Sequence, residues 1–101
     1  MLQGLLNEAA KRMATKRTLL EQMDANPAAG WKMKDIETLC NQVGLSLKPP
    51  AHGSHYKVLS DILHGAPTVP YRRPIKAVYI KEIVSFAKAH IAARESRGTE
   101  G

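Results

Sequence analysis

The chain reads LSLKPPAHGSHYKVL from residue 45 to residue 59, and apolar residues alternate with polar ones at both ends of this stretch. In the first four residues the leucines share one face, and the serine and lysine share the other. Near the end, Tyr56 and Val58 share one face and His55 and Lys57 the opposite one. A period of two is typical of half-buried strands. Because prolines and a glycine separate the two parts, the stretch predicts two strands joined by a turn.

Upstream of these strands the apolar residues recur at helical spacing. Residues 32–43 predict a helix, and Gly44 follows as its C-terminal cap. Residues 2 to about 24 predict a longer helix, which ends before Pro27 because the residue preceding a proline is pushed out of the helical region. Trp31, just before the second helix, is expected to pack as an anchor.

Downstream, the sequence predicts one more strand and one more helix. A short third strand is expected near residues 67–71, where its prolines suit a sheet edge. Residues 74 to about 93 predict the last helix, with a broad apolar face. The polar residues 94–101 are expected to fray. The order of helix, helix, three strands and helix predicts an α+β domain in which helices cover the apolar face of the sheet.

The bulk composition is compatible with one small basic domain. The chain has 101 residues, 15 Lys and Arg against 9 Asp and Glu, and a net charge of +6. Such an excess attracts polyanions such as nucleic acid, although a merely basic protein fits the charge equally well. The one cysteine, Cys40, excludes an internal disulfide and is expected in the core. Without an apolar run of about 18 residues, the expected location is the cytoplasm, with no membrane contact.

The predicted solvent-exposed face of the sheet carries Lys48, His55 and Lys57. Histidine can transfer protons near neutral pH, which metal-free RNA cleavage requires. Gly53 would let the backbone approach a phosphate, Ser54 could donate a hydrogen bond to it, and Lys57 could stabilise its charge. A surface histidine without chemistry remains the alternative for a Gly-Ser-His tripeptide.

A second cationic group comprises Arg72, Arg73 and Lys76, at the expected start of the last helix. Cations oppose the helix dipole at this end, so the pattern favours a bound anion such as an RNA phosphate. The alternative is that these side chains extend into solvent or pair with acids elsewhere.

Metal chemistry is not expected from this sequence. His52, His55 and His64 lack the cysteine pair or carboxylate cluster that would complete a metal site. The sequence also lacks a glycine-rich phosphate loop, so no cofactor is expected.

From Trp31 to about residue 90 the chain resembles the HicA family of mRNA-cleaving toxins from type II toxin–antitoxin systems. The features that match are Trp31, Val43-Gly44, Gly53-Ser54-His55-Tyr56-Lys57-Val58, Thr68-Val69-Pro70 and Pro74-Ile75-Lys76-Ala77-Val78-Tyr79-Ile80. The chain differs from many members in having alanine where they have proline after the lysine, in lacking His-Pro after the second strand, and in its longer N-terminal helix.

The resemblance implies a double-stranded-RNA-binding-like fold, in which a helix, a three-stranded antiparallel sheet and a helix follow one another. It implies metal-independent cleavage of mRNA with His55 as the catalytic histidine, and inhibition by a HicB-type antitoxin. The expected organisation is a helical extension at residues 1–27, the ribonuclease domain at 28–93 and the tail at 94–101.

Two other functions compete with an RNA-cleaving toxin. One is a non-catalytic module that binds double-stranded RNA by its shape. The other, with less support, is a protein-interaction domain whose basic face meets an acidic partner.

Overall fold

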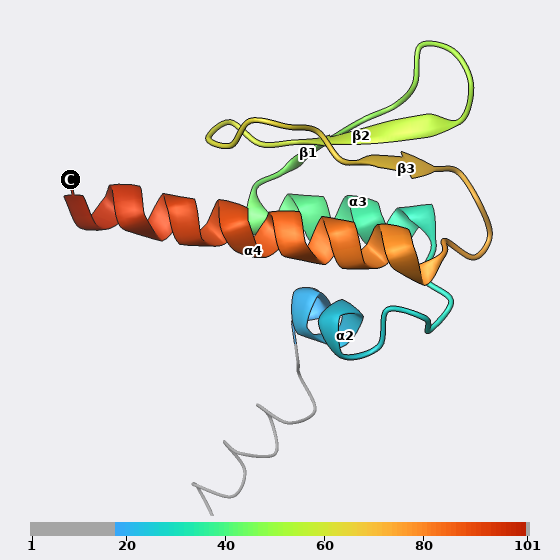
Figure 1. Ribbon diagram of the computed structural model, residues 1–101, viewed down its shortest axis with the longest axis horizontal. Helices are drawn as coiled ribbons and strands as arrows, with labels where there is room; N and C mark the ends of the chain where they lie inside the picture. The colour runs from blue at the N-terminus through green and yellow to red at the C-terminus, as the bar shows by residue number, and fades with distance from the viewer. Residues whose placement is uncertain (1–17, 101) are drawn as a thin grey trace, which may run out of the picture.

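The computed structural model describes residues 18–100, with side chains for residues 18–97. This part of the chain forms three helices and an open three-stranded antiparallel sheet, an α+β arrangement (Figure 1). The helix predicted for residues 2 to about 24 does not run unbroken through residue 18, because Thr18 is extended and caps a helix that begins at Leu19. Residues 2–17 lie outside the described range. The elements are α2 (Leu19–Ala25), α3 (Met33–Val43), β1 (Ser46–Lys48), β2 (His55–Leu59), β3 (Thr68–Pro70) and α4 (Ala77–Glu100).

The sheet has the order β1-β2-β3, so β2 lies in the centre. On β1, Lys48 pairs with Lys57, and on β3 Thr68 pairs with the same Lys57. Val58 and Val69 point toward the helices and are fully buried. The helices α3 and α4 lie on one side of the sheet, and no helix of the described part of the chain covers its other side (Figure 1). The predicted alternation is therefore confirmed, with an inner apolar face and an outer polar one.

Helix α3 has the ends that its sequence predicts. Asp35 accepts a hydrogen bond from the backbone nitrogen of Lys32 at 2.8 Å, which satisfies a free amide at the start of the helix. Gly44 ends the helix with a φ of 85°, a left-handed conformation that glycine adopts without steric cost. Cys40, on the same helix, is buried in the core as expected.

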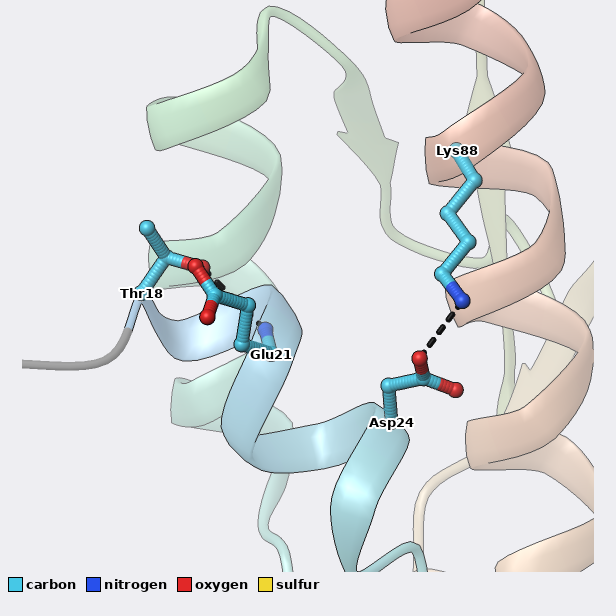
Figure 2. Close-up of polar contacts among 4 residues, drawn as sticks. All are labelled: Thr18, Glu21, Asp24 and Lys88. Carbon is cyan, nitrogen blue, oxygen red and sulfur yellow. Dashed lines mark hydrogen bonds and ion pairs between the residues drawn. The ribbon is translucent and has the colours of Figure 1, made fainter. Parts of the chain in front are cut away.

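Helix α2 packs against α4 on the side away from the sheet (Figure 1). Met23 is its buried anchor, and Asp24 forms a 2.5 Å ion pair with Lys88 of α4 (Figure 2). Thr18 caps the helix by accepting a hydrogen bond from the backbone nitrogen of Glu21 at 3.2 Å. The fold thus has three layers, which are the sheet, the pair α3 and α4, and α2.

Helix α4 begins later and ends later than the sequence predicted. It begins at Ala77 rather than at Pro74. The reason is that Ile75 is buried in the core and its backbone nitrogen donates a hydrogen bond of 2.9 Å to the carbonyl of Trp31, which holds this residue outside the helix. The helix continues to Glu100, through residues that we expected to form a frayed polar tail. Residues 92–95, which are two alanines, an arginine and a glutamate, favour helix, and no proline follows them.

Candidate functional site

His55 is the first residue of β2, and its side chain is exposed. In the loop before it, Gly53 has a φ of 80°, a left-handed conformation that glycine adopts without steric cost, and the space around Gly53 is open. The carbonyl of Ser54 accepts a hydrogen bond of 2.7 Å from the backbone nitrogen of Tyr71. This hydrogen bond joins the loop to the end of β3, next to the strand position from which His55 faces the open side of the sheet.

A pair of lysines lies two residues along the sheet from His55, on the same face. Lys48 and Lys57 are direct cross-strand partners, and both side chains are exposed. Like charges directly opposite in a sheet repel, at a cost of about 1 kcal/mol for groups roughly 5 Å apart in water. Within residues 18–97, neither lysine has an acidic partner in ion-pair range. An anion bound over this rung would remove the repulsion.

The second cationic group starts beside His55. His55 pairs with Pro70, and the chain then continues through Tyr71 to Arg72 and Arg73. Both arginines are exposed. The end of β3 and the loop that leads to α4 lie at the same end of the fold (Figure 1). Strand pairing therefore places the backbone of Tyr71, and of Arg72 after it, near that of His55.

Lys76 occupies the N-terminal boundary of α4. Its carbonyl accepts the first helical hydrogen bonds, from Tyr79 at 3.1 Å and Ile80 at 3.3 Å, and its side chain is exposed. The first turn of α4 contains no acidic residue. The positive end of the helix dipole and the lysine charge thus add, which favours an anion there.

The other two histidines considered as metal ligands, His52 and His64, lie at opposite ends of β2. His52 is exposed in the loop before β2, whereas His64 lies in the loop at the opposite end of that strand. His64 lines a groove of about 710 Å³ between this loop and α4, whose apolar walls include Val78 and Phe86. Among the described residues, no three His, Cys, Asp or Glu side chains lie close enough to hold a metal ion.

Two features of the described structure were not identified from the sequence. One is Tyr71, an exposed aromatic residue that follows β3 and precedes the two arginines. An aromatic residue beside paired cations is a signal that sequence reasoning could have used.

The second is His90, which is fully buried. Its Nδ1 atom lies 2.7 Å from the hydroxyl oxygen of Ser60. Its spacing from Ile83 and Ala87 continues the buried stripe of α4, and this spacing could have predicted its burial. Because His90 is fully buried, it is not accessible to a substrate.

Comparison with known protein families, with curated proteins and with solved structures finds no match to this chain. Across the described residues, no helix has both the length and the apolar character needed to cross a membrane.

Proposed function

We propose that the chain is the toxin component of a type II toxin–antitoxin system, an endoribonuclease that cleaves mRNA without a metal ion. The observation that carries this proposal is the setting of His55. Its exposed imidazole lies on an open sheet face, two residues along the sheet from the paired Lys48 and Lys57. On its other side it neighbours β3, the strand that leads to Arg72. Proton transfer and phosphate binding are thereby available on one surface.

The chemistry is attack of a ribose 2′-hydroxyl on the adjacent phosphorus. The bond from oxygen to phosphorus forms, the bond from phosphorus to the 5′-oxygen breaks, and the products are a 2′,3′-cyclic phosphate and a free 5′-hydroxyl. His55 transfers a proton at the 2′-hydroxyl or at the leaving oxygen. Lys57 stabilises the charge that develops on the phosphate, and Ser54 and His52 are the nearest further groups in the sequence that could assist.

The order of elements supports the family resemblance. Helix α3, three antiparallel strands and α4 follow one another as in a double-stranded-RNA-binding-like domain, and α2 is an addition before it. In this proposal residues 28–93 form the catalytic domain, RNA lies across the open face, and a HicB-type antitoxin inhibits the toxin by covering that face. The toxin would act in the cytoplasm, where its substrate is.

The test is cleavage of labelled RNA by the purified chain in EDTA, with His55→Ala and His64→Ala assayed beside it. His64 is the matched control because it is also exposed but lies at the other end of β2. We expect cleavage by the unmodified chain and by His64→Ala, and none by His55→Ala. Equal cleavage by all three would remove His55 from the mechanism.

A non-catalytic RNA-binding module is the second candidate, and the cationic surface alone favours it. The lysine rung and the arginines would bind phosphates whether or not His55 reacts. This function predicts an intact RNA with shifted mobility in the same assay, and binding that weakens steeply with salt.

A further inference from the structure

Tyr71 is one of two large apolar side chains that the described residues expose, with 45% of its surface accessible. Its ring is held from two directions. Tyr56 packs behind it at 6.1 Å between centroids with a tilt of 31°. Arg73 donates a hydrogen bond of 3.1 Å to its hydroxyl. An aromatic ring that has packing and hydrogen-bond partners and is yet exposed is the kind of surface on which a nucleic-acid base stacks.

The guanidinium of Arg73 lies over the ring of Tyr71, but farther from it than a stacked group would be. Its carbon is 5.9 Å from the ring centroid, and the bond to the hydroxyl places it near the hydroxyl edge. Part of the ring face therefore stays open, while the arginine charge lies beside it for a phosphate of the same nucleotide chain.

The ring is also close to the candidate catalytic histidine along the backbone. His55 pairs with Pro70, and Tyr71 is the next residue. With cross-strand Cα separations of about 5 Å and consecutive ones of about 3.8 Å, the Cα atoms of His55 and Tyr71 lie roughly 6–7 Å apart.

The two side chains leave the sheet on different sides. Tyr71 follows Val69 in the alternation and packs with Tyr56, whereas His55 belongs to the open face. A nucleotide chain that contacts both must pass around the end of the sheet. A flexible single strand can do so, whereas a stiff A-form duplex keeps its bases stacked inside and presents no base face to a side chain.

We propose that Tyr71, positioned by Arg73, stacks on an unpaired base next to the scissile phosphate and so makes the site select single-stranded RNA. This inference rests on the proposed function for the identity of the scissile phosphate. The stacking of Tyr71 on a base is a binding contact, so it can be measured without cleavage. Tyr71 acts as a specificity residue, and His55 transfers the proton.

The experiment measures anisotropy of a fluorescent single-stranded RNA and of a hairpin duplex, with the full chain carrying His55→Ala to prevent turnover. Adding Tyr71→Leu should weaken single-strand binding by about 5- to 150-fold, the range expected for loss of one stacked base, and change duplex binding little. Tyr71→Phe should restore most of the affinity, since it keeps the ring. The salt dependence should keep its slope because no phosphate contact is removed.

Val78→Ala is the matched control, because Val78 is the other large exposed apolar residue and lies on α4. It should bind both RNAs as the parent does. Unchanged single-strand affinity in Tyr71→Leu, or equal losses for single strand and duplex, would overturn the inference. So would the absence of measurable RNA binding by the parent.

Tyr71→Leu could also disturb its packing on Tyr56. If its melting temperature falls, single-stranded RNAs with an abasic nucleotide at successive positions test the same contact against the parent. A loss at one position is expected, and uniform affinity at all positions overturns the inference.

Cleavage by the chain with intact His55 is scored separately. If that chain fails to cleave while the Tyr71 effect is present, the proposed function fails and the stacking contact stands. If it cleaves but Tyr71→Leu binds normally, only the stacking contact fails.

Discussion

The hydroxyl oxygen of Ser60 lies 2.7 Å from Nδ1 of His90, and this contact joins the end of β2 to α4. The same oxygen accepts hydrogen bonds of 3.0 Å from the backbone nitrogens of Ile62 and Leu63. With both lone pairs engaged, the serine must donate its proton to Nδ1. The imidazole proton then lies on Nε2, which is buried and has no hydrogen-bond partner among the described residues.

Ser60→Ala is therefore expected to destabilise the fold. It removes the donor to Nδ1 and the acceptor of two backbone amides, and a buried polar group without a partner costs about 1–3 kcal/mol. Urea unfolding followed by circular dichroism measures the loss. Ser85→Ala, an exposed serine on α4, is the control and should stay within about 0.5 kcal/mol of the parent. Equal stability of both variants would show that the Ser60 contact contributes nothing.

The stability of Gly44→Ala should also fall. Gly44 has a φ of 85°, and a side chain there costs about 1–2 kcal/mol from the left-handed backbone alone. The added methyl would also collide with the guanidinium of Arg94, which would have to move away from the end of α3. Gly53→Ala is the comparison, because its φ of 80° gives similar strain but the space around it is open. Chemical denaturation should find Gly44→Ala at least as destabilised as Gly53→Ala, and the reverse order would contradict this account.

The sequence predicted well those features that depend on neighbouring residues. The alternation in residues 54–59 identified β2 and assigned His55 and Lys57 to its exposed face. The position of Gly44 located the end of α3. In both cases the pattern is local, since a period of two or a glycine at a helix end expresses a backbone preference within a few residues.

Features set by distant contacts could not be predicted in this way. Pro74 suited a helix start, but the contact between Ile75 and the carbonyl of Trp31 holds that segment outside α4. The pair Ser60 and His90 is separated by 30 residues. The position of Tyr71 beside Ser54 depends on the register of β3 against β2, which the sequence of either strand alone does not specify.

Cys40 should resist thiol reagents in the folded chain. Burial, with a smaller effect from the charge of Glu37, raises the pKa of its thiol to about 11, so little reactive thiolate exists at pH 8. Because the chain has one cysteine, the rate of reaction with a disulfide reagent reports this position alone. The rate should rise steeply when denaturant unfolds the chain, whereas fast reaction under native conditions would contradict the burial.

The same thiol gives a pH dependence of stability. The folded chain binds this proton more tightly than the unfolded chain, whose thiol has the ordinary pKa of 9.0. Stability from this group is complete below pH 9 and is lost as the pH rises toward 11. Cys40→Ala should show a smaller decrease in unfolding free energy over that interval, and an identical decrease in both chains would exclude a contribution from the thiol.

Lys57 should contribute one phosphate contact to RNA binding. Replacing it by methionine keeps the apolar part of the side chain, so the slope of log affinity against log salt should become shallower by about 1. Removal of the repulsion with Lys48 should leave stability unchanged or raise it by less than about 1 kcal/mol. Lys34→Met on α3 removes the same charge from an exposed position outside the sheet, and its slope should match the parent. If the two variants shift the slope equally, the effect belongs to net charge, and the open face of the sheet is not where the RNA backbone lies.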